Sequence, residues 1–86
     1  MRLTPDPQKR FSAFDQSFFF LMYAGETAVL CKVPRNALYA IGDAENAEEI
    51  FVRRRPEIER VASAKFHSEQ LDVTSVVTVD TWDWDR

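Results

Sequence analysis

The stretch that decides the fold is Ser17-Phe-Phe-Phe-Leu-Met-Tyr-Ala24, followed by Gly25-Glu26 and then Thr27-Ala-Val-Leu-Cys-Lys-Val33. Two apolar runs thus flank a two-residue loop that begins with glycine. This pattern predicts a β-hairpin with a type II′ turn, because that turn needs a positive φ at its first central residue. The register that follows pairs Ala24 with Thr27 and Phe18 with Val33.

Alternation along the two predicted strands gives the hairpin two faces, and both are mostly apolar. The face expected to pack on the core carries Phe18, Phe20, Met22, Val29, Cys31 and Val33. The opposite face carries Phe19, Leu21, Tyr23, Ala28, Leu30 and Lys32. A single layer of helices covers only one of these faces, so the second face is a candidate interaction surface.

The segment after the hairpin predicts two helices. Pro34 starts a short helix over residues 35–41, and Gly42 is expected as its left-handed C-terminal cap. Asp43 is the expected N-cap of the next helix, with Glu45 in its first turn. Residues at helical spacing predict one long helix over about residues 44–67, kinked at Pro56 on its solvent side, with two abutting helices as the alternative. The stripe consists of Ala47, Ile50, Phe51, Arg54, Ile58, Val61, Ala62 and Phe66.

The remaining segments complete a single domain over residues 1–86. Residues 1–9, which contain two prolines, are predicted to form a loose N-terminal arm, and residues 11–14 a short edge strand. Residues 72–80 are rich in β-branched side chains and predict a last strand with Val73, Val77 and Val79 on one face, followed by a tail over residues 81–86. The expected fold is α+β, with an antiparallel sheet (the N-terminal hairpin plus the C-terminal strand) packed against a short and a long kinked helix.

The composition excludes most chemistry. The 86 residues include one histidine, one cysteine and two glycines, and the net charge is −3. These counts exclude an internal disulfide, a metal site with two histidines and a glycine-rich phosphate loop, and the acidic balance argues against a general polyanion binder. No cofactor, metal or catalytic residue is therefore predicted. The longest apolar run, residues 18–24, is too short to span a membrane, and a cytoplasmic location is expected.

Three groups of polar residues are possible sites. Cys31 alternates with core valines and is predicted to be buried, and His67 is predicted to be solvated or to cap the long helix. In the run Arg53-Arg54-Arg55, Arg53 has Glu49 one turn before it and Glu57 one turn after it. Arg55 has Glu59 one turn after it, and these pairs predict a self-neutralising helix surface. The third group, Asp80, Asp83 and Asp85, is expected in a solvated tail. A Cys31- or His67-dependent enzyme and a nucleic-acid-binding regulator that uses the arginines with Arg60 stay as alternatives.

The surplus of apolar surface points to an interaction module. Trp82 and Trp84 either fold back over the sheet or act as contact anchors, since tryptophan is enriched where binding energy concentrates. The predicted function is that of a non-catalytic protein-interaction or self-association module. The predicted partner is a second copy of the chain, which gives a homodimer, or another protein. The predicted interface consists of Phe19, Leu21, Tyr23, Leu30, Trp82 and Trp84.

The chain resembles a known family in two motifs and in Asp80 after the last strand. The first motif is Phe20-x4-Gly25-x3-Val29-x-Cys31-x-Val33-x3-Ala37-Leu38. The second is Phe51-x3-Arg55-x2-Ile58-Glu59-x2-Ala62-x2-Lys65-Phe66. These motifs are similar to those of the small bacterial domain of unknown function family 1488, over about residues 14–80. The resemblance implies a compact bacterial α+β protein with no established activity, in which Arg55 and Lys65 match polar positions.

Overall fold

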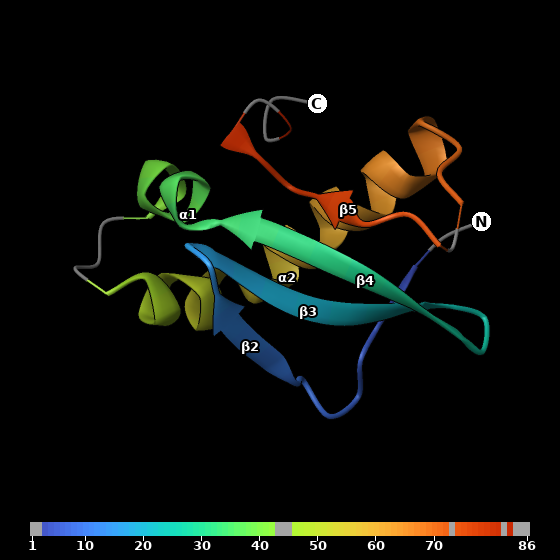
Figure 1. Ribbon diagram of the computed structural model, residues 1–86, viewed down its shortest axis with the longest axis horizontal. Helices are drawn as coiled ribbons and strands as arrows, with labels where there is room; N and C mark the ends of the chain where they lie inside the picture. The colour runs from blue at the N-terminus through green and yellow to red at the C-terminus, as the bar shows by residue number, and fades with distance from the viewer. Residues whose placement is uncertain (1–2, 43–45, 73, 82, 84–86) are drawn as a thin grey trace.

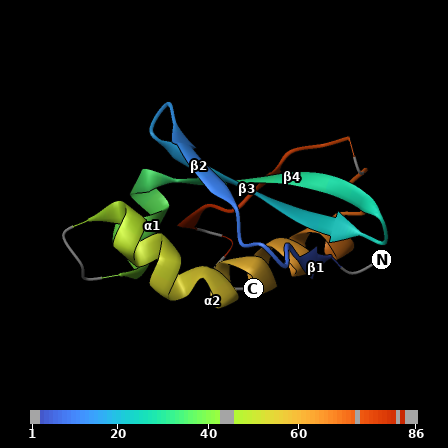
Figure 2. The ribbon, with the colours of Figure 1, turned by 90° about the horizontal axis from the view of Figure 1, so that it is seen from below.

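The computed structural model describes residues 3–42, 46–72, 74–81 and 83, and it confirms the α+β class (Figure 1). A five-stranded mixed sheet has both helices on one of its faces, as the view along the sheet shows (Figure 2). None of the described helices is long and apolar enough to cross a membrane. The elements are β1 (Thr4–Pro5), β2 (Phe11–Phe14), β3 (Ser17–Ala24), β4 (Thr27–Pro34), α1 (Arg35–Ile41), α2 (Ala47–Ser68) and β5 (Val77–Thr78).

The predicted hairpin is confirmed in every pair, from Ala24 opposite Thr27 to Phe18 opposite Val33. Gly25 has a φ of +65°, as its place in the turn requires. The predicted edge strand over residues 11–14 is β2, which pairs antiparallel with β3. The side chains predicted for the core face of the hairpin are all buried. The alternation of apolar residues therefore identified the covered face of the sheet.

The orientation predicted for the last strand was wrong, because β5 pairs parallel with β4, with Cys31 opposite Val77. Helix α2 returns the chain to the end of the sheet where β4 begins, so the next strand runs in the same direction as β4 (Figure 1). The strand is also shorter than predicted. Asp72 Oδ1 accepts hydrogen bonds from the Thr74 N–H (3.0 Å) and hydroxyl (3.2 Å), which form a turn instead. Val77 and Val79 are buried as expected, and Val73 lies outside the described residues.

The N-terminal segment is not the loose arm that its prolines predicted. Leu3 is buried, and its N–H donates to Ser63 Oγ of α2 at 3.1 Å, while β1 pairs with β3. Asp6 is 1% exposed, and Arg10 Nε donates to its carboxylate at 3.1 Å. This hydrogen bond, together with the N–H groups of Gln8 and Arg10, holds the pKa of Asp6 below its usual value. The arm prediction failed because Pro5 lies at the sheet edge, where a strand tolerates proline.

Both predicted caps at the junction of the helices need correction. Gly42 has a φ of −130° and is not left-handed; a Cβ there would lie 2.6 Å from Ile50 Cγ2, so glycine permits the close approach of the helices. The N-cap of α2 is Asn46, whose Oδ1 accepts the N–H of Glu48 at 2.8 Å. Asp43 and Glu45 lie outside the described residues. The long helix starts at Ala47.

Helix α2 continues through Pro56 without interruption, which confirms one long helix and excludes the two abutting helices. Its apolar stripe packs against the sheet, with Phe51 fully buried between the ring of Phe18 (centroids 5.3 Å apart) and that of Phe11 (4.9 Å). Arg54, which was predicted in this stripe, is half-buried. The buried arginine is Arg55, one residue further along.

Candidate functional site

The sheet face that points away from the helices is apolar and uncovered within the described part of the chain. Cross-strand register and alternation place six large apolar side chains on it, and they form what we call the open face: Phe14, Phe19, Leu21, Tyr23, Leu30 and Val76. Phe14, Leu30 and Val76 are 72%, 39% and 46% exposed, and the other three are half-buried. The surplus apolar face that the alternation predicted is therefore present in the fold.

Four of the six predicted interface residues lie together on this surface, and Leu21 and Leu30 are direct cross-strand partners. Trp82 and Trp84 lie outside the described residues. Phe14 and Val76 were missed by the sequence analysis. Alternation along β2 and β5, continued from the hairpin, is the signal that places them on this face.

Two cationic side chains border the open face: Lys32 lies over an aromatic ring, and Arg10 donates a hydrogen bond to a tyrosine hydroxyl. Lys32 Nζ lies 5.9 Å from the ring centroid of Phe19, and Arg10 Nη2 lies 3.3 Å from Tyr23 Oη. A cation above an aromatic ring is attracted by its negative face. Lys32 thus lies against the ring of Phe19, whereas the charge of Arg10 is balanced by the buried carboxylate of Asp6.

A buried ionic cluster joins α2 to the N-terminal segment. Arg55 Nε donates to Glu59 Oε2 at 3.1 Å, and both side chains are buried. The two other guanidinium nitrogens donate to the backbone carbonyls of Lys9 (2.8 Å) and Arg10 (3.0 Å). Lys9 Nζ also lies 3.2 Å from Glu59 Oε1. Because nearly every polar atom of the cluster is used to hold the chain, its geometry is that of a structural anchor.

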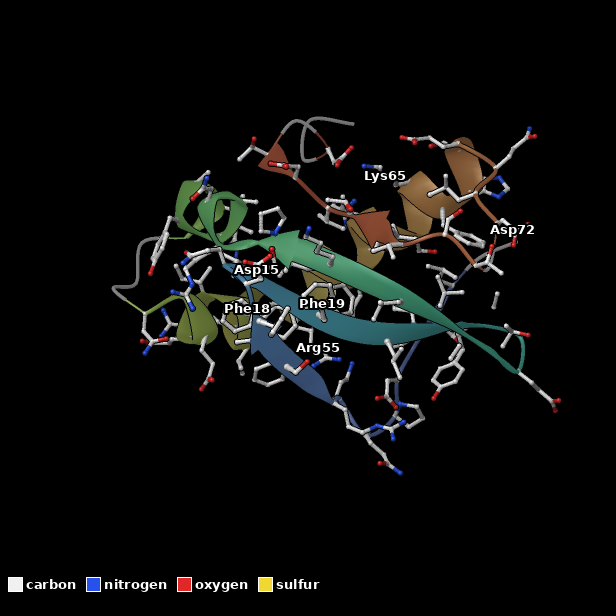
Figure 3. All side chains as sticks on the ribbon, viewed as in Figure 1. Asp15, Phe18, Phe19, Arg55, Lys65 and Asp72 are labelled. Carbon is white, nitrogen blue, oxygen red and sulfur yellow. The ribbon has the colours of Figure 1, made fainter. Side chains whose placement is uncertain are left out.

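A second cluster joins α2 to the C-terminal segment. Lys65 Nζ donates to the carbonyl of Thr78 and, at 2.9 Å, to Asp83 Oδ2. The same carboxylate oxygen accepts the N–H of Asp80 at 2.9 Å. The prediction of a solvated aspartate was therefore wrong for Asp83, which is buried; Asp85 lies outside the described residues. Figure 3 shows the two cationic anchors apart from each other, Arg55 near β2 and Lys65 near β5.

The arginine run is neutralised by neighbouring glutamates. Arg53 pairs with Glu49 at 2.8 Å, as predicted, and Arg54 pairs with Glu57 at 3.3 Å, where the prediction had placed Glu57 with Arg53. Arg55 is buried and pairs with Glu59, so it is not on the surface that a nucleic acid could contact. This arrangement does not favour the nucleic-acid alternative.

The two residues considered for nucleophilic or acid–base chemistry lie in unlike environments. Cys31 is fully buried, as predicted, and burial raises the pKa of its thiol to about 12. His67 is exposed in the last turn of α2. Across residues 3–42, 46–72, 74–81 and 83, no group of three or more His, Cys, Asp or Glu side chains could hold a metal ion.

We expect Cys31 to be unreactive towards a thiol reagent in the native protein at pH 8, because a thiol with a pKa of about 12 is almost entirely protonated there and is shielded from solvent. The measurement is the release of a coloured thiolate from an aromatic disulfide reagent, compared between the native and the denatured protein. One thiol should react at once in denaturant, and the native protein should react only as fast as it unfolds. Rapid labelling of the native protein would restore the Cys31-dependent enzyme as a candidate.

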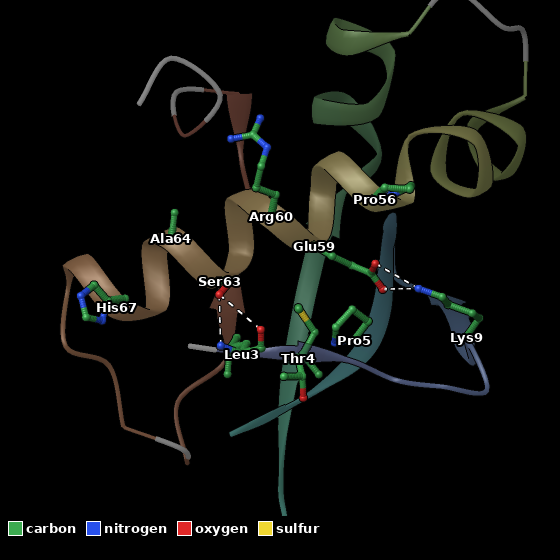
Figure 4. Close-up of a pocket in the computed structure, with 11 residues that line it drawn as sticks. Leu3, Thr4, Pro5, Lys9, Pro56, Glu59, Arg60, Ser63, Ala64 and His67 are labelled. Atoms are coloured by element: carbon green, nitrogen blue, oxygen red, sulfur yellow. Dashed lines mark hydrogen bonds and ion pairs between the residues drawn. The ribbon is translucent and has the colours of Figure 1, made fainter. Parts of the chain in front are cut away.

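A groove of about 870 Å³ lies between β1 and α2 (Figure 4). Leu3 and Pro5 line one side, and its polar groups are largely engaged: Ser63 binds the backbone of Leu3, and Lys9 binds Glu59. Figure 4 shows Arg60 pointing away from β1, so its charge does not converge with that of Lys9 on one ligand. The groove therefore lacks a set of polar groups that could orient a small molecule.

No protein-family model and no curated protein matches the sequence. A solved structure does match: the crystal structure of a protein of unknown function from the DUF1488 family, from Shewanella loihica PV-4. The TM-score is 0.69 with 19% identity, and the match covers 92% of each chain. The chain has the DUF1488 fold. This likeness to a solved structure agrees with the family resemblance found in the sequence, and at this identity it is evidence of fold.

The DUF1488 fold gives a structural meaning to the two motifs of the sequence. Their apolar positions are buried side chains of β3, β4, α1 and α2. Their polar positions, Arg55, Glu59 and Lys65, make the two ionic anchors. The motifs therefore describe how the fold is held together, and the open face lies mostly outside them.

Proposed function

We propose that this protein is a non-catalytic self-association module of the bacterial cytoplasm, and that the open face binds the open face of a second copy. The observation that carries the proposal is the apolar surface that extends over β2, β3, β4 and β5 with no covering element in the described chain. Sheet faces of this kind pack on each other about 10 Å apart with nearly aligned strands.

The size of the face supports a second copy as the occupant. The molecule measures 35 × 27 × 21 Å, and its sheet lies across the broad side of this shape (Figure 1). A stable interface typically buries ~800 Å² per partner, so a contact between two copies would use most of this broad side. An isologous contact also needs a surface that is complementary to itself. An apolar sheet face meets this need without matching charges.

We expect Leu21→Lys to dissociate the dimer. Leu21 lies on the central strand β3, opposite Leu30, and a two-fold contact would bury two added ammonium groups without partners. The measurement is light scattering coupled to size-exclusion chromatography at high micromolar concentration. Wild type should have at least twice the mass of the chain, and the variant half the mass of the wild type.

The matched control is Val52→Lys, at an apolar residue that is 57% exposed on the solvent side of α2. This variant should keep the wild-type mass, since Val52 lies far from the open face. A monomeric wild type at high micromolar concentration would reject self-association through the face. An equal loss of mass in both variants would show that the effect comes from charge and not from the surface.

A further inference from the structure

We propose that strand β2 is a second self-association surface, where it pairs antiparallel with β2 of another copy and continues the sheet across the two chains. This contact uses the backbone groups at the edge of the sheet, and of the open face it involves Phe14 alone. It therefore goes beyond the function proposed above and does not depend on it.

The turn after β2 determines which backbone groups are free. Asp15 and Gln16 have φ values of +53° and +65°, the pattern of a type I′ two-residue turn. The residues that flank such a turn, Phe14 and Ser17, form a hydrogen-bonded pair. Alternation then directs the N–H and C=O of Ser12 towards β3 as well.

The remaining residues of the strand, Phe11 and Ala13, direct their N–H and C=O groups away from β3. Within the described part of the chain β2 pairs with β3 alone, and no turn or loop hydrogen bond uses these outward groups. Figure 1 shows β2 at the lower margin of the sheet. The strand, Phe-Ser-Ala-Phe, contains no proline and no charged residue, which are the features that usually block pairing at an edge.

One register uses all of the outward groups. A two-fold axis perpendicular to the sheet, at Ser12, places Phe11 opposite Ala13 of the second copy and Ala13 opposite Phe11 of the second copy. Four backbone hydrogen bonds then join the chains. The two copies of Ser12 meet as a non-hydrogen-bonded pair, in which the Cα atoms are about 4.5 Å apart.

The side chains favour a second copy over an unrelated strand. The same register places Arg10 of each chain opposite Phe14 of the other. Arg10 points to the open face, since it reaches Tyr23 Oη, and its side chain is 57% exposed. Phe14 is 72% exposed and is the most exposed of the large apolar residues described. Two guanidinium–aromatic contacts would then cover the most exposed ring of the structure.

The test is Ser12→Cys, followed by mild oxidation and non-reducing electrophoresis. In the proposed register the two Cα atoms lie within the 4.4–6.8 Å that a disulfide spans. Native Cys31 is buried and should not compete. We expect Ser12→Cys to form a disulfide-linked dimer at least tenfold faster than Thr27→Cys, an exposed control at the tip of the β3–β4 hairpin.

A second substitution separates the edge from the face. Adding Ala13→Pro to Ser12→Cys removes an outward N–H donor without removing a hydrogen bond to β3, so cross-linking should be lost at an unchanged melting temperature. Adding Leu21→Lys should leave cross-linking unchanged. The proposal would be overturned if Ser12→Cys and Thr27→Cys formed the cross-linked dimer at equal rates. It would also be overturned if Leu21→Lys abolished cross-linking and Ala13→Pro did not. Should Ala13→Pro lower the melting temperature, Phe14→Lys replaces it beside Ser12→Cys, because this exposed position then sets a lysine opposite Arg10 of the second copy.

Discussion

Replacing Glu59 with leucine should lower the free energy of unfolding by about 3–5 kcal/mol, because it leaves the guanidinium of Arg55 buried without its counter-ion. Both side chains are almost inaccessible, at 7% for Arg55 and 5% for Glu59. The ring centroids of Phe20 and Phe51 lie 5.6 and 5.2 Å from the guanidinium carbon. These rings attract the positive charge, but they do not replace the carboxylate as its counter-ion. The measurement is chemical denaturation followed by circular dichroism.

The double variant Arg55→Met/Glu59→Leu is the control for this prediction. It removes both buried charges, so it should be less destabilised than the sum of the two single variants. It should not regain wild-type stability, since the carbonyls of Lys9 and Arg10 lose their donor. Additive effects of the two substitutions would contradict a coupled buried pair.

Phe51→Ala should cost a similar amount, about 3–5 kcal/mol, the usual range for truncating a buried aromatic side chain. Phe51 is fully buried, and its ring contacts Phe11, Phe18 and Phe20 at centroid distances of 4.9, 5.3 and 5.6 Å. The cavity would open where α2 meets β2 and β3. A domain of this length has only ~4–13 kcal/mol of stability, so a measurable unfolded fraction is expected near physiological temperature.

Thermal melting of Phe51→Ala beside Val52→Ala checks this prediction. Val52 is the next residue of the same helix and is 57% exposed, so its truncation should change the stability by less than about 0.5 kcal/mol. A melting temperature for Phe51→Ala within a few degrees of that of Val52→Ala would show that the aromatic cluster is not the centre of the core.

The local features of the fold were predictable because local physics determines them. The Gly25 turn and the alternation around it determine both strands and the register of the hairpin, and the helical spacing located α2. The orientation of β5 was not predictable from local pattern, because it follows from the path of a helix between two strands. Gly42 was misassigned for a related reason: its need for glycine comes from Ile50 and not from its own φ.

The candidate surface was predicted in part. The second hairpin face followed from alternation, whereas Phe14 and Val76 join it only through the pairing of β2 and β5 with the hairpin. The anchoring roles of Arg55 and Lys65 could not be predicted either. A charged residue in a helix is more often solvated, and the partners of these two come from the opposite ends of the chain.

The anchor at Arg55 has a consequence for how far sequences with this fold can diverge. Its guanidinium binds the main-chain carbonyls of residues 9 and 10, which every amino acid provides. Lys65 holds the carbonyl of Thr78 in the same way. Substitutions at the anchored positions leave these contacts in place, so the ends of the chain can change their side chains while keeping their path. This is one physical route by which two chains that are 19% identical can share one fold.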